Sequence, residues 1–159
     1  MQKAISLSLI LRPMSLGDAR KTGYGELSKA LAEGVLEDEP ANHYAHGLLA
    51  VWHVEVERRG GMLGAAVMGA SLKAGRGHYE EAARLAPEDI ALRWQWARAL
   101  AALDAKKHRD EIESALQTAI STQPANDLDR VMKGRAARLL EVVARNKPKD
   151  VERLALAMH

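Results

Sequence analysis

Apolar residues beyond Gly23 recur at the spacing of a helix face, and no stretch shows the sustained apolar–polar alternation typical of a half-buried strand. Most of the remaining positions hold Ala, Arg, Glu or Lys, which favour helices. Proline and glycine interrupt the pattern at intervals. The pattern predicts an all-α protein, with helices near 24–37, 41–59, 62–86, 89–104, 109–122, 127–145 and 149–158.

The N-terminal stretch, residues 1–23, precedes this pattern. Its apolar run up to Leu11 is similar to the core of a secretory signal, but the pair Arg12-Pro13 interrupts that run. We expect residues 1–23 to form an extension, a helix or strap against the body of a cytoplasmic protein, and residues 24–159 to form one domain. The alternative is a leader over residues 1–19, which would make the protein periplasmic.

One arrangement of residues comes before three of the prolines. A large apolar residue is followed by a small one three positions on, and a proline comes five positions after that. The first two share a helix face, the small one lets a neighbouring helix come close, and proline stops the helix. The clear copies are Tyr79-x-x-Ala82-x-x-x-x-Pro87 and Leu116-x-x-Ala119-x-x-x-x-Pro124, and Ala32-x-x-Val35-x-x-x-x-Pro40 is a weaker third.

This arrangement resembles the tetratricopeptide repeat (TPR) family, and in particular its divergent bacterial members; the family's repeat is a helix-turn-helix of about 34 residues. The family's Trp-x-x-Leu-Gly-x-x-Tyr pattern corresponds here to His46-x-x-Leu49-Ala50-x-x-His53, Arg93-x-x-Trp96-Ala97-x-x-Leu100 and Arg130-x-x-Lys133-Gly134-x-x-Ala137. The resemblance covers roughly residues 24–145. It implies a right-handed α-α superhelix of about three antiparallel helix hairpins, with a C-terminal capping helix.

The same resemblance implies a concave groove that binds a protein or peptide partner. Carrying over the groove positions of the family gives Tyr44, Val51, Glu55, Trp94, Arg98, Val131, Arg135 and Arg138. An aromatic anchor beside three guanidinium groups suits an extended peptide with acidic side chains or a free carboxylate. The alternative is a solvated basic face, with Trp94 packed against a neighbouring hairpin and not open to a partner.

Charge and composition narrow the classes of function. The chain has 23 Lys+Arg and 21 Asp+Glu residues, a balance far from the dense basic footprint of a nucleic-acid-binding protein. No run beyond the N-terminal stretch approaches the length of a membrane span. The absence of cysteine excludes disulfides and thiolate chemistry, and the sequence contains no familiar catalytic or nucleotide-binding motif. We therefore expect a non-catalytic protein without a cofactor, whose partner is neither nucleic acid nor membrane.

Two further hypotheses remain open. His43, His46, His53 and Glu57 fall within about 80 degrees on one predicted helix, which suggests a helical enzyme, a metal or ligand site, or a pH-sensitive surface. His46 and His53 are two turns apart, a rise of ~10 Å that is too long for one metal ion, so we assign no metal ligands. The other hypothesis is an oligomerising helical protein without a groove.

Overall fold

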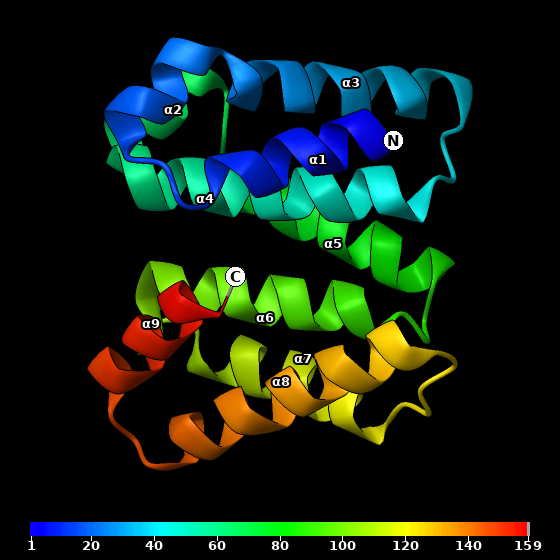
Figure 1. The fold of residues 1–159 in the computed structure, drawn as a ribbon, viewed down its shortest axis with the longest axis vertical. Coiled ribbons are helices and arrows are strands. Elements are labelled where there is room, and N and C mark those ends of the chain that lie inside the picture. Colours follow the sequence, from blue (N-terminus) through cyan, green and yellow to red (C-terminus); the bar gives the residue numbers. More distant parts are fainter. Residues whose placement is uncertain (159) are drawn as a thin grey trace. The chain divides into compact units, whose positions relative to one another are not determined.

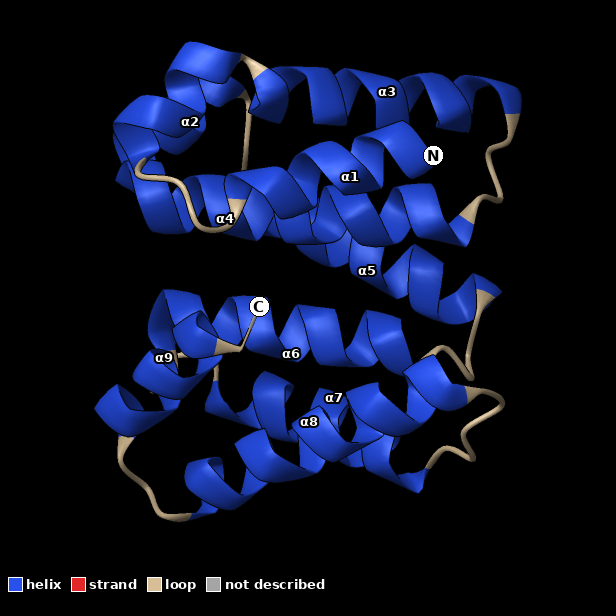
Figure 2. Cartoon of the chain, viewed as in Figure 1, coloured by secondary structure: helices blue, strands red, loops and turns tan. Residues whose placement is uncertain are grey.

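The computed structural model describes residues 1–158, and these residues form α-helices joined by short loops (Figures 1 and 2). This confirms the expected all-α class. The helices are α1 (Gln2–Leu11), α2 (Leu16–Thr22), α3 (Tyr24–Asp38), α4 (His43–Met68), α5 (Leu72–Leu85), α6 (Ile90–Asp104), α7 (Arg109–Ser121), α8 (Asp127–Ala144) and α9 (Pro148–Ala157).

Most helices start at a polar residue whose side chain caps the first turn. Asn42, Asp89 and Asn126 each accept a hydrogen bond from the backbone N–H three residues on, at 3.1, 2.9 and 2.9 Å. Each such bond satisfies one of the N–H groups that a helix start leaves without a partner. Pro148 occupies the first turn of α9, where its missing N–H costs nothing. Five of the predicted helices, α3 and α6 to α9, lie within one or two residues of their expected bounds, and these local signals mark the starts of α6, α8 and α9.

At the Gly60-Gly61 pair two helical segments meet across a kink, where the sequence predicts the boundary between two helices. At Gly61 the backbone has φ 62° and ψ −171°, a combination that is essentially restricted to glycine. The chain changes direction there and resumes a helix up to Met68, so α4 is longer than predicted and α5 starts only at Leu72. The predicted helix 62–86 therefore belongs to two different elements.

The chain divides into two compact units, Met1–Leu85 and Ala86 onward. In the first unit α1 and α2 pack on α3, α3 on α4, and α4 on α5. The buried Ser28 hydroxyl of α3 donates a hydrogen bond to the Ala4 carbonyl of α1 at 2.9 Å. The N-terminal stretch thus contains two helices, α1 and α2, that pack within the first unit.

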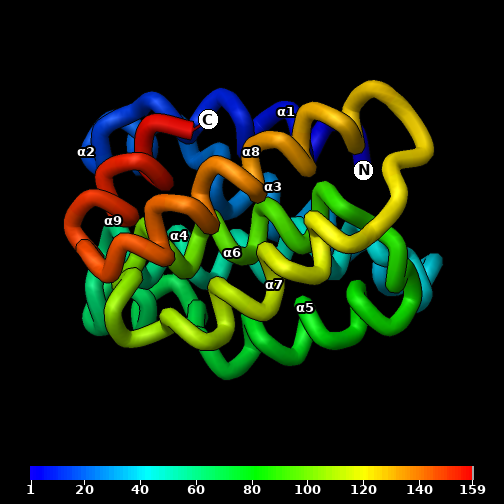
Figure 3. Tube along the Cα trace, turned by 90° about the horizontal axis from the view of Figure 1, so that it is seen from below, coloured from blue at the N-terminus to red at the C-terminus, as the bar shows by residue number. Residues whose placement is uncertain are grey.

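In the second unit α6 packs against α7, α8 and α9, and α8 lies beside both α7 and α9 (Figures 1 and 3). Eleven of the 15 residues of α6 are buried, so this helix has no solvated stripe. The unit's core includes fully buried Trp96, Leu100, Ile112, Leu116 and Leu139. Nowhere in residues 1–158 does a helix have both the length and the apolarity needed to cross a membrane.

Candidate functional site

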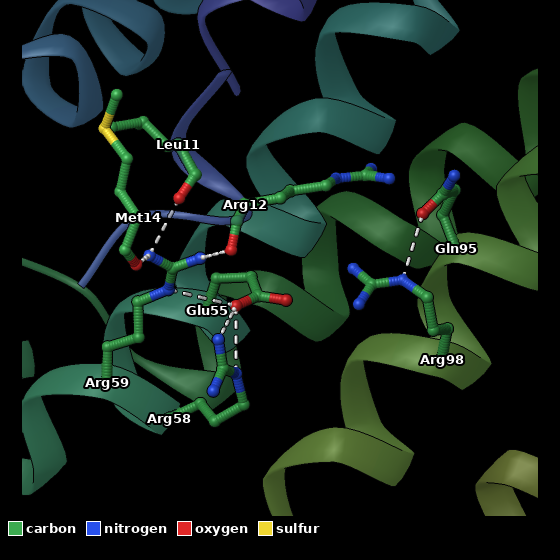
Figure 4. Close-up of polar contacts among 8 residues, drawn as sticks. All are labelled: Leu11, Arg12, Met14, Glu55, Arg58, Arg59, Gln95 and Arg98. Carbon is green, nitrogen blue, oxygen red and sulfur yellow. Dashed lines mark hydrogen bonds and ion pairs between the residues drawn. The ribbon is translucent and has the colours of Figure 1, made fainter. Parts of the chain in front are cut away.

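The predicted groove residues of the first unit have different surroundings. Tyr44 is 58% exposed, whereas Val51 is half-buried. The Glu55 carboxylate accepts hydrogen bonds from Arg58 at 2.9 and 2.7 Å and from Arg59 at 3.5 Å, all on α4 (Figure 4). Glu55 is therefore engaged by two arginines of its own helix.

Arg59 connects this ion-pair cluster to another part of the first unit. Its guanidinium also donates hydrogen bonds to the backbone carbonyls of Leu11, Arg12 and Met14, at 3.1, 3.3 and 3.4 Å (Figure 4). These three carbonyls end α1 and form the loop to α2, so Arg59 ties that loop to α4. Glu55 contacts Arg59 from one turn away and so helps to orient the guanidinium that binds this loop.

On α6, the structure differs from the groove prediction. Trp94 is fully buried and Arg98 is 3% exposed, so neither side chain presents a surface to a partner. The Arg98 Nε donates a hydrogen bond to the Gln95 Oε1 at 3.3 Å (Figure 4). The physical reason is that α6 is covered around its circumference: Trp94 and Trp96 lie on opposite sides of the helix, and both are buried. Of the two readings of Trp94, the packed one is confirmed.

The groove residues of α8 lie together at the edge of a hollow in the second unit. The hollow measures about 430 Å³ and is lined by Val131, Gly134, Arg135, Arg138, Ala157 and Met158. The four α8 residues share one helix face, because they are spaced three and four positions apart. The remaining wall comes from the end of α9 and the residue that follows it.

Charge and shape of this hollow are set by three α8 residues. Within residues 1–158 neither Arg135 nor Arg138 makes a hydrogen bond or an ion pair, whereas the Arg130 guanidinium on the same helix pairs with Asp127. Gly134 directly precedes Arg135, and a Cβ placed there would meet nothing within 4 Å. Among the described residues, the hollow therefore combines two arginine side chains without an ion-pair partner with open space and apolar Val131.

The predicted histidine face of α4 is not assembled as expected, because His46 and His53 both meet His78 of α5. The Nδ1 atoms of His46 and His78 are 2.9 Å apart, and the rings of His53 and His78 stack with centroids 5.8 Å apart. His43 instead packs its ring against Tyr44. Among the described residues, no group of three or more His, Asp or Glu side chains is placed to hold a metal ion.

Burial has a strong effect on two of these histidines. The pKa of His53 is lowered from 6.5 to about 4, mainly by burial and also by the neighbouring His78 and Lys29, whereas Glu33 acts in the opposite direction. Burial and the neighbouring His46 likewise lower the pKa of His78. Both rings are therefore neutral at pH 7. Sequence reasoning did not include His78, because its meeting with α4 depends on the register between two helices.

Comparison with known proteins adds no assignment: no family model, no curated protein and no solved structure matches the chain. What the molecule does must therefore be argued from its own geometry, and the α8–α9 hollow is the predicted binding surface that this geometry favours.

Proposed function

We propose that this protein is a non-catalytic interaction module with TPR-like stacking of helix hairpins, and that its α8–α9 hollow binds an acidic segment of a protein partner. The packing of α4 on α5, α6 on α7 and α8 on α9 supports the hairpins. In the second unit α6 also packs on α8, as the first helices of adjacent hairpins do in repeat proteins.

The observation that carries the proposal is the pair of guanidinium groups, Arg135 and Arg138, at a hollow with apolar Val131 and Met158. Guanidinium groups bind carboxylates through two parallel hydrogen bonds, and they do so best where they are not already paired. A hollow of about 430 Å³ has room for one or two side chains of a peptide. We therefore expect an apolar side chain next to an aspartate, a glutamate or a terminal carboxylate.

The lining of the hollow favours binding over catalysis. Its six residues are Val, Gly, Arg, Arg, Ala and Met, and none of them is a nucleophile or titrates near neutral pH. An enzyme at this surface would need such a group within reach of the bound ligand. Recognition of a charged segment needs only the features present.

A library of fluorescent nine-residue peptides tests this proposal. The peptides combine one apolar residue with Asp, Glu, Asn or Gln next to it, and each has a free or an amidated C-terminus. We expect micromolar binding of the acidic members, weakened by added salt because the contacts are near the surface. The amidated peptides separate recognition of a side chain from recognition of a chain end.

Three variants connect binding to the hollow. The double variant Arg135→Gln plus Arg138→Gln should weaken binding at least about tenfold, since each lost charge-assisted contact contributes ~1.5–3 kcal/mol. Gly134→Leu should fill the hollow, and the open space at Gly134 lets the helix keep its fold. Arg130→Gln, on the same helix but outside the hollow, is the matched control. Equal binding by all variants, or no binding by the wild type up to millimolar peptide, contradicts the proposal.

Self-association is a second candidate function, favoured by one specific observation. Beyond the kink in α4, Met62, Leu63 and Val67 are 84%, 85% and 79% exposed. No charged residue lies between Arg59 and Lys73, so two copies of this surface would meet without repulsion. Sedimentation of the wild type and of Leu63→Glu tests it: a concentration-dependent dimer that the variant abolishes supports self-association, and a monomer at every concentration excludes it.

A further inference from the structure

His46, in the first turn of α4, makes hydrogen bonds through both nitrogens of its ring. Its Nε2 atom lies 3.0 Å from the carbonyl oxygen of Pro40. A carbonyl oxygen can only accept a hydrogen bond, so the Nε2 of His46 carries the hydrogen and donates it. In the neutral ring the other nitrogen, Nδ1, then carries no hydrogen and can accept a hydrogen bond through its lone pair.

The tautomer of His46 determines that of His78. Their two Nδ1 atoms are 2.9 Å apart, and a hydrogen bond at this distance needs one hydrogen between them. Since the Nδ1 of neutral His46 accepts, the Nδ1 of His78 donates. Two imidazole ligands of a tetrahedral zinc ion would be roughly 3.3 Å apart, given Zn–N bonds of about 2.0 Å, so the observed geometry is that of a shared proton.

His53 provides a second bond of the same kind between the two helices. Its Nδ1 accepts a hydrogen bond from the backbone N–H of Ser71, the residue before α5, at 3.2 Å. The ring is only 5% exposed and stacks on His78. The start of α5 and its middle are therefore both held to α4 by a histidine nitrogen that must stay unprotonated.

Protons at the two free ring nitrogens of the His46–His78 pair have different effects. A proton at the Nε2 of His78 leaves the bond between the rings in place. A proton at the Nδ1 of His46 removes the acceptor and brings two N–H groups face to face.

We propose that His46, His53 and His78 form an acid-sensitive latch that holds α5 on α4 at neutral pH and releases it in mildly acidic solution. The pKa values of His53 and His78 are lowered in the folded protein. Their contribution to the free energy of unfolding is therefore complete above pH 6.5 and is lost as the pH falls below it. The latch is independent of the proposed peptide binding, because all its residues lie in the first unit.

The charged groups that face the latch do not cancel this effect. On α3, Lys29 opposes and Glu33 favours protonation of His53 and His78, and the two are paired with each other. On α5, Glu81 interacts with His46 but is paired with Arg84. Each acidic group thus has a cationic partner nearby, and the facing groups contribute little net charge.

Hydrogen exchange and NMR test the latch directly. At pH 7.5, long-range ¹H–¹⁵N spectra should show His46 protonated at Nε2 and His78 protonated at Nδ1. Between pH 7.5 and 5.0, the protection of the α5 amides, corrected for intrinsic rates, should fall relative to that of α7. His78→Asn keeps an N–H near the position of the Nδ1 and cannot be protonated, so its loss of protection should be smaller than that of the wild type.

Two further variants make the outcome unambiguous. His43→Asn, one turn before His46 on α4, should keep the full wild-type response. His78→Leu removes the donor, so α5 should exchange faster than in the wild type already at pH 7.5. The latch is overturned by the opposite tautomers, by wild-type protection of α5 that does not change with pH, or by an unchanged response in His78→Asn.

Discussion

Replacing His53 by asparagine should remove a large part of the pH dependence of the first unit's stability. The pKa of His53 is about 4 in the folded protein and 6.5 in the unfolded chain, so the unfolded chain binds more protons between these values. The free energy of unfolding therefore falls as the pH falls. Integrating the difference gives a loss of about 2 kcal/mol from pH 7 to pH 5 and about 3 kcal/mol by pH 4.

Asparagine suits this experiment because its side-chain oxygen can take the place of the imidazole Nδ1. It can still accept the hydrogen bond from the Ser71 N–H, and it does not titrate. The smaller side chain will lower stability at every pH, because His53 is buried. That cost is the same at pH 7 and pH 5, so the difference between the two pH values isolates the titration.

The measurement is native-state hydrogen exchange of the α4 amides at pH 7 and pH 5, with an NMR titration of the His53 ring alongside. The wild type should lose about 2 kcal/mol more than His53→Asn over this interval, and His43→Asn should behave like the wild type. A His53 pKa near 6.5, or equal losses in the wild type and His53→Asn, would refute the reasoning.

The remaining predictions concern stability and are read by thermal or urea unfolding. Gly61→Ala should destabilise by ~1–3 kcal/mol because of its positive φ, whereas Gly64→Ala, where a Cβ meets nothing within 4 Å, should be neutral or stabilising by up to ~1 kcal/mol. Leu139→Ala should lower the free energy of unfolding by ~2–5 kcal/mol because the side chain is fully buried. Leu128→Ala, at an exposed position, should change it by no more than ~0.5 kcal/mol. Ser28→Ala should cost ~1–3 kcal/mol and speed hydrogen exchange in α1, whose carbonyl loses its donor. Equal effects within either matched pair, or unchanged α1 exchange, would contradict these assignments.

Most helix bounds follow from residue chemistry within a few positions. Local chemistry is sufficient for that: the caps Asn42, Asp89 and Asn126 and the helix-stopping prolines act within a few residues of where they stand. Local reasoning also placed a boundary at Gly60-Gly61, but it missed the helix end at Met68, where Gly69 takes a positive φ of 64°. Ala65, just past Gly61, packs against Trp52, which anchors the resumed helix.

Only the tertiary structure decided which side chains are available for function. A helical wheel places Trp94 and Trp96 on opposite sides of α6, but it cannot show that both sides are covered. The meeting of His46 with His78 depends on the register between α4 and α5, and the hollow at Arg135 depends on where α9 ends. Spacing along the chain fixes faces within one helix, whereas contacts between helices arise from packing that involves residues far apart in the sequence.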